Sequence, residues 1–146
     1  MEGFLKKLNA KYDLDANYGS LFAEGPVDIS GLEEEFKKLN ALRDDSIESL
    51  KIKEEHYRNI RSEGGLWSKT ETICNLWTAA FFIQHTQSNR DNKRLITNDE
   101  FFRYINGEQI AASYTASANA LASELRFFHW ELEFPEVFAK GGFDLM

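Results

Sequence analysis

The sequence contains few side chains that suit catalysis or metal binding, and these side chains are widely spaced. The histidines are His56, His85 and His129, and the one cysteine is Cys74. A structural zinc site needs about four converging nitrogen or sulfur ligands. We therefore predict no metal site. Cys74 lies in an apolar segment, so we expect a buried small hydrophobic side chain rather than a nucleophile.

Asp28, Glu35 and Lys37 have the residue types of a nuclease metal centre. Glu35 and Lys37 fall early in a predicted helix, where residues two positions apart point about 200° apart. Both side chains therefore cannot face one ion. We expect a solvated helix face here and predict no catalytic residue in the chain.

Three cations lie close together at Arg90, Lys93 and Arg94, in and after a polar stretch at residues 88–93 that we predict to be a loop. Such a loop suits contact with DNA phosphates, with Arg103 as a further neighbour. The alternative is an ordinary solvated loop, since Asp91 reduces the local positive charge.

Charge and hydropathy exclude several classes of protein. The formal net charge of -7 disfavours a nucleic-acid binder that acts alone. No apolar run approaches the roughly 20 residues that span a bilayer, so we expect no membrane partner. The N-terminus lacks the apolar centre of a signal peptide, and one cysteine allows no internal disulfide. These features favour a cytoplasmic location.

The positions of Gly and Pro and the apolar spacing predict an all-α fold. Ser30 and Glu33 form a capping-box pattern, and no Gly or Pro interrupts residues 32–61. Gly64 and Gly65 then end this helix, and a second, strongly apolar helix follows at about residues 66–87. We predict that helices 31–62 and 66–86 form a long antiparallel hairpin. The second helix is apolar nearly all round, so we expect it to be buried on several sides.

One or two further helices complete the expected helical domain, residues 1–128. Thr97 and Glu100 form another capping-box pattern, which opens a short helix to about Asn106. The next helix covers residues 108–128, and a short helix is expected at residues 3–11. From residue 129 to 146 we predict an irregular or extended tail, because Pro135 and the Gly141-Gly142 pair interrupt regular structure.

This tail carries a resemblance to a known family, the type II restriction-modification DNA methyltransferases. It resembles in particular the single-chain enzymes that both methylate and cut DNA. These enzymes have a His-Trp-x-Leu-x-Phe-Pro-x-Val-Phe segment, followed by Gly-Phe-Asp and a strand. The first element is matched here by His129, Trp130, Leu132, Phe134, Pro135, Val137 and Phe138. The second is matched by Gly142, Phe143 and Asp144. The segment LWTAAFF, residues 76–82, is also similar to a helix upstream in that family.

The resemblance implies a helical piece of an adenine-specific enzyme that transfers a methyl group from S-adenosylmethionine to adenine N6. In the family, an Asn-Pro-Pro-aromatic catalytic loop follows directly, and this sequence stops at Met146 before any such loop. A Gly-rich cofactor loop is absent as well. We therefore expect no enzymatic activity and no cofactor in this fragment, with the remainder of the methyltransferase chain and DNA as partners in the parent enzyme.

The alternative is a stand-alone helical protein-interaction module without enzymatic activity. The chain is rich in Phe and Trp, and aromatics at helical spacing are usually core residues. Some of them are instead expected to cover the face that meets the missing methyltransferase core. A fragment that exposes such a face is expected to form a homodimer through it.

Overall fold

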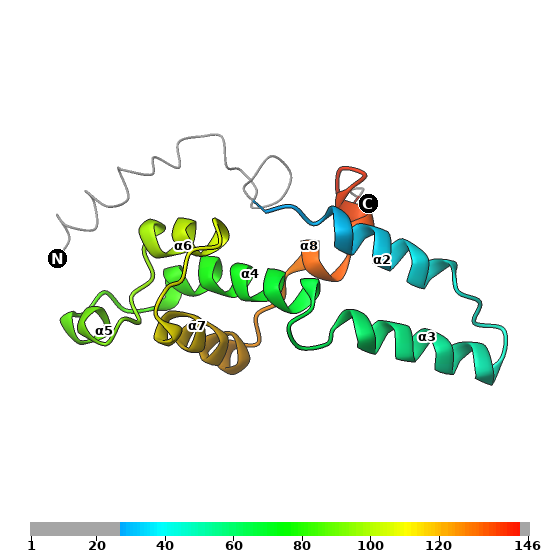
Figure 1. The fold of residues 1–146 in the computed structure, drawn as a ribbon, viewed down its shortest axis with the longest axis horizontal. Coiled ribbons are helices and arrows are strands. Elements are labelled where there is room, and N and C mark those ends of the chain that lie inside the picture. The colour runs from blue at the N-terminus through cyan, green and yellow to red at the C-terminus, as the bar shows by residue number, and fades with distance from the viewer. Residues whose placement is uncertain (1–26, 144–146) are drawn as a thin grey trace. The chain divides into compact units, whose positions relative to one another are not determined.

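A computed structural model describes residues 27–143 of the chain, and this part is all-α, as predicted (Figure 1). The described residues contain no strand. The helices are α2 (Ser30–Ala41), α3 (Ile47–Ile60), α4 (Leu66–Phe82), α5 (Gln87–Asp91), α6 (Asn98–Ile105), α7 (Ala112–Leu125), α8 (Trp130–Glu133) and α9 (Pro135–Phe138). The predicted helix at residues 3–11 and the end of the predicted tail, residues 144–146, lie outside the described residues.

The contacts divide the described chain into two compact units. Unit 1 comprises residues 72–128, and unit 2 comprises residues 27–71 together with 129–143. The division falls within α4, between Glu71 and Thr72. The C-terminal tail thus belongs to the same unit as the first two described helices.

The prediction of one helix across residues 32–61 is wrong, because the chain leaves the helical conformation at Leu42. A new helix, α3, then begins after Ser46. The amide of Ser49 donates to Ser46 Oγ at 3.1 Å, and the amide of Ser46 donates to Ser49 Oγ at 3.0 Å. This reciprocal pair satisfies amides that would otherwise lack partners at a helix start, so it stabilises the break.

The capping box predicted at Ser30 and Glu33 is also wrong. Ser30 is the first residue of α2, and the N-cap position is occupied by Ile29, which makes no side-chain capping bond. The amide of Ser30 donates instead to Asp28 Oδ1 at 2.8 Å. Asp28 therefore supplies the acceptor that the pattern assigned to the Glu33 side chain.

Unit 2 is built around the apolar face of α2. Leu32, Phe36 and Leu39 pack with Trp67 at the start of α4 and with Leu132 of α8. Within the unit, α2 contacts both α3 and α9, and α8 contacts α9. The predicted hairpin between residues 31–62 and 66–86 is not confirmed, since its first helix is broken at Leu42 and α2 packs on α3 and α9 as well as on Trp67. Two four-residue helices, with Pro135 at the first position of α9, interrupt the otherwise irregular tail.

Unit 1 packs α4, α6 and α7 around Leu76, Ala79, Ile96, Phe101 and Ala118. The capping box at Thr97 and Glu100 is confirmed at the start of α6. Three boundaries differ from the prediction: α7 begins at Ala112 and ends at Leu125, and α4 ends at Phe82. The end of α4 is also less buried than expected, because Phe81 is 76% and Phe82 56% exposed.

Candidate nucleic-acid interface

The three predicted DNA-contacting cations lie on a short helix and the turn that follows it. Arg90 is on α5, and Lys93 and Arg94 come directly after that helix. All three side chains are exposed. The predicted polar loop is therefore partly helical, because Thr86 Oγ1 accepts from the amide of Asn89 at 3.1 Å and caps α5.

The backbone that carries these cations is held by several hydrogen bonds. Lys93 adopts a left-handed conformation with φ of 51°. The carbonyl of Asn89 then accepts from the amides of Arg94 at 2.8 Å and Leu95 at 3.2 Å. Ser113 Oγ on α7 donates to the carbonyl of Lys93 at 2.8 Å. The cations thus project from a fixed turn, which reduces the entropy lost when they bind an anion.

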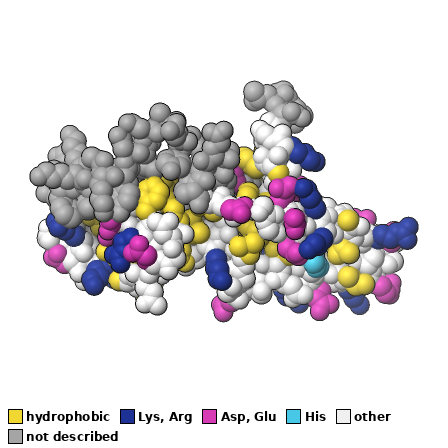
Figure 2. Space-filling model, turned by 45° about the horizontal axis from the view of Figure 1, so that its top comes forward, with side chains coloured by type: hydrophobic (Ala, Val, Ile, Leu, Met, Phe, Trp, Pro, Cys, Tyr) yellow, Lys and Arg dark blue, Asp and Glu magenta, His cyan; other side chains and the backbone are white. Residues whose placement is uncertain are grey.

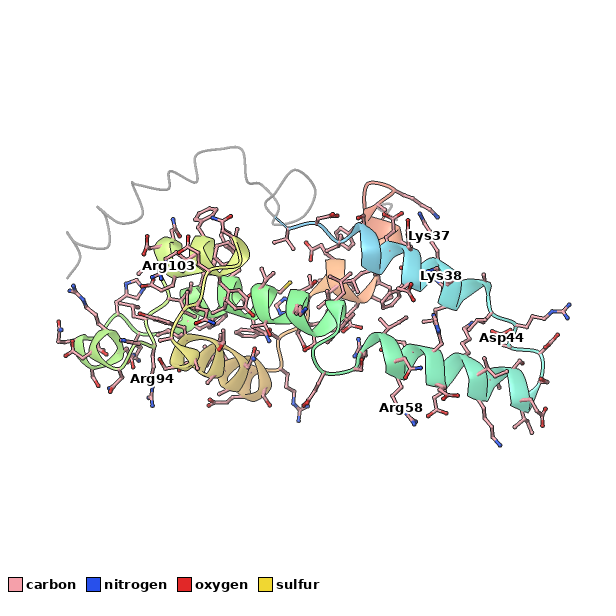
Figure 3. All side chains as sticks on the ribbon, in the orientation of Figure 1. Lys37, Lys38, Asp44, Arg58, Arg94 and Arg103 are labelled. Carbon is pink, nitrogen blue, oxygen red and sulfur yellow. The ribbon has the colours of Figure 1, made fainter. Side chains whose placement is uncertain are left out.

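Arg103, expected as a further neighbour, is engaged elsewhere. Its Nε donates to Glu108 Oε2 at 3.0 Å, and its Nη2 donates to the carbonyl of Gln109 at 3.3 Å. The hydrogen bond to Glu108 is the main cause that raises the pKa of Arg103. Figure 3 shows Arg103 on α6 and Arg94 well separated. Arg103 therefore does not join the group at residues 90–94.

A groove in unit 1 lies beside these cations. Its volume is about 590 Å³, and its lining includes Arg94 and Asn89, the aromatic ring of Phe82, and the small residues Ser113, Ala116, Ser117 and Ala120 of α7. Glu124 contributes a carboxylate to the same groove. Sequence analysis missed this groove, although the run of small residues at helical spacing on α7 was a visible signal for it.

Two groups of residues in the tail of unit 2 differ in burial. Leu132 and Pro135 are almost fully buried and anchor the tail. Trp130, Phe134 and Phe143 are exposed, with Trp130 at 54%, and their rings contact one another at centroid distances of 5.6 to 5.9 Å. We call these three residues, with Phe138 packed on Phe143, the tail aromatic cluster.

An ion pair joins the tail to α3 and α4 within unit 2. Arg61 pairs with Glu133 of α8, and its guanidinium lies 4.8 Å from the Tyr57 ring centroid and 4.2 Å from that of Trp67. Burial raises the pKa of the nearby Glu71 carboxyl, with Arg61 opposing the shift and Glu133 adding to it. Sequence reasoning missed this arrangement, because its members are far apart along the chain.

The other candidate residues do not assemble into a catalytic set. Glu35 pairs with Lys38 at 2.7 Å, and Lys37 pairs with Glu33, so Glu35 and Lys37 face different partners. Burial lowers the pKa of His129, a half-buried residue. Cys74 is buried, as predicted. Among residues 27–143, no three His, Cys, Asp or Glu side chains are grouped to hold a metal ion.

The part of the chain that the structure describes contains no helix with the length and hydropathy needed to cross a membrane. Comparison with known proteins finds no matching family model, no matching curated protein and no matching solved structure.

Proposed function

We propose that this chain is the non-catalytic helical region of a restriction-modification DNA methyltransferase that modifies adenine N6. The enzyme as a whole would transfer the methyl group from S-adenosylmethionine to adenine in DNA. The proposal places the cofactor site and the catalytic loop in another part of the enzyme. It also implies a cytoplasmic location.

The observation that carries the proposal is the tail aromatic cluster. The residues with the family resemblance include both the buried anchors Leu132 and Pro135 and the exposed rings of Trp130, Phe134 and Phe143. Exposed aromatic rings gathered in one place are typical of surfaces that another structure covers. A methyltransferase core that follows this tail would cover them.

The cations at residues 90–94 have a role in the same proposal. Arg90, Lys93 and Arg94 are exposed and are carried by a fixed turn, which suits contact with the phosphates of bound DNA. The net charge of -7 makes strong binding by this chain alone unfavourable. The cations would therefore assist a larger DNA-binding surface rather than form one.

Reading the gene beyond the codon for Met146 tests the proposal directly. We expect an in-frame Asn-Pro-Pro-aromatic sequence within a few codons. A stop codon at that point would contradict the proposal. Calorimetric titration of this chain with S-adenosylmethionine should release no heat of binding, and tight binding would show that the cofactor site has been assigned to the wrong part of the enzyme.

A second candidate is a stand-alone helical interaction module, and the surface of α3 favours it. No residue of α3 is buried, and Ile47 is 69% exposed, with Leu50, Ile52 and Tyr57 also exposed. Figure 2 shows hydrophobic side chains among charged ones over α2 and α3. Ile47, Leu50 and Tyr57 lie on one side of α3, and an exposed apolar face of this kind also suits a homodimer.

Sedimentation of the chain and of its Leu50→Lys variant tests this second function. A dimer that dissociates in the variant would support self-association through α3. A monomer at all concentrations would rule out the homodimer.

A further inference from the structure

One wall of the groove in unit 1 carries an exposed aromatic ring. Phe82, the last residue of α4, lines the groove and is 56% exposed. Its ring packs against Phe127 with centroids 5.5 Å apart, so its position is supported. Supported, exposed aromatic rings are the surfaces on which single-stranded nucleic acids stack their bases.

The cation that lines the same groove has a fixed backbone. Arg94 lines the groove, and its amide donates to the carbonyl of Asn89 at 2.8 Å. Arg90 and Lys93 are near in sequence and exposed but do not line the groove, and Asp91 between them offsets part of their charge. Glu124 lines the groove as well and disfavours a phosphate in its vicinity. The charges therefore favour a phosphate near Arg94 only.

The size and chemistry of the groove suit one unstacked nucleotide. Its volume of about 590 Å³ lies within the roughly 300–1,000 Å³ of sites that hold small ligands. Ser113, Ser117 and Gln84 add hydroxyl and amide groups that can bond to base edges. A base inside a duplex has both faces stacked on its neighbours and must leave the stack to reach Phe82, which costs a few kcal/mol, so a single strand places a base there more readily.

We propose that this groove binds a single-stranded DNA segment, with a base against Phe82 and the adjoining phosphate at Arg94. The choice of DNA as the nucleic acid rests on the proposed function, whereas the site itself rests on the groove. The site is distinct from the tail aromatic cluster, which belongs to unit 2.

Fluorescence anisotropy with a labelled ten-nucleotide thymidine strand at low salt tests the proposal on the full chain. We expect saturable binding that weakens as salt is raised. Phe82→Ala should weaken binding about 5- to 150-fold, because loss of one stacked base costs about 1–3 kcal/mol. Phe82→Trp should keep the affinity, since the indole supplies an equivalent stacking face.

Two matched variants serve as controls. Phe81→Ala removes the neighbouring ring, which is more exposed and is not part of the groove lining, and should leave affinity unchanged. Arg94→Ala should weaken binding and reduce the salt dependence by about 0.7 in the log–log slope. Arg58→Ala, in unit 2, should change neither the affinity nor the salt dependence of binding (Figure 3).

Absence of binding at high micromolar protein would overturn the proposal. Equal losses in Phe81→Ala and Phe82→Ala, or tighter binding of a duplex of the same length, would also overturn it. Circular dichroism of each variant separates loss of the site from loss of the fold. None of these outcomes changes what the gene encodes after Met146, so this proposal and the proposed function can fail separately.

Discussion

Unit 1 and unit 2 close their cores in different ways. The core cluster of unit 1 uses residues from one continuous stretch, Ile73 to Phe127. Unit 2 combines residues 29–67 with Leu132, and its ion pair Arg61–Glu133 spans 72 positions. A contact between distant positions must overcome the entropy of closing the chain between them. Unit 2 therefore depends on the tail, while the core residues of unit 1 that the structure describes all lie within residues 72–128.

This difference also separates the two candidate surfaces. The groove that we propose for single-stranded DNA is formed within unit 1. The tail aromatic cluster is formed in unit 2 by the residues that anchor the tail and their immediate neighbours. Substitutions in the tail are thus expected to affect the tail aromatic cluster and to leave the groove of unit 1 intact.

The largest expected effect comes from replacing one buried leucine by alanine in the core of each unit. Leu132→Ala in unit 2 and Leu76→Ala in unit 1 remove side chains that are almost fully buried. Each should lower the free energy of unfolding by about 2–5 kcal/mol. Hydrogen exchange followed by mass spectrometry should place the faster exchange in residues 27–71 and 129–143 for Leu132→Ala, and in residues 72–128 for Leu76→Ala. Uniform acceleration in both variants would show that the units unfold as one.

A smaller effect is expected from the ion pair that holds the tail. Arg61→Met removes the pairing with Glu133 and two ring contacts, and leaves a partly buried carboxylate without its cation. We expect a loss of about 2 kcal/mol in urea unfolding. Arg58→Met is the matched control, since its pair with Glu54 is exposed and contributes at most about 0.5 kcal/mol. Equal losses in the two variants would mean that Arg61 contributes no more than a surface cation.

The break between α2 and α3 gives the next prediction. Ser46→Ala removes the capping oxygen and should cost about 1 kcal/mol in urea unfolding. Ser30→Ala, at the start of α2, should cost much less, because its amide keeps the bond to Asp28. A larger effect at Ser30 than at Ser46 would contradict the assignment of the helix starts.

The smallest effect concerns pH and Glu71 in unit 2. Burial raises the pKa of this carboxyl above its ordinary value of 4.5, so the folded state binds the proton more tightly than the unfolded state. The free energy of unfolding should therefore fall as pH rises from 4.5 through the raised pKa. Glu71→Gln should be more stable than the original chain at pH 7, with the difference shrinking toward pH 4.5. If urea titrations show the same difference in unfolding free energy between Glu71→Gln and the original chain at every pH, the raised pKa of Glu71 is not its cause.

The sequence by itself determined the features that depend on neighbouring residues. The all-α class follows from apolar spacing and from the positions of Gly and Pro. The start of α6 follows from Thr97 and Glu100, which act on each other within one turn. Burial of Cys74 follows from the apolar segment around it. Each of these depends on interactions over a few residues, so a local pattern is sufficient to predict them.

The tertiary structure decided which apolar side chains are covered and which partners meet. Leu76 and Phe82 are on the same helix, yet one is fully buried and the other largely exposed, because burial depends on what packs opposite. The groove beside Arg94 depends on α4, the turn after α5 and α7 meeting in unit 1. Arg61 meets Glu133 only because the tail returns to unit 2. These contacts join residues that are distant along the chain, and periodicity carries no information about such pairings.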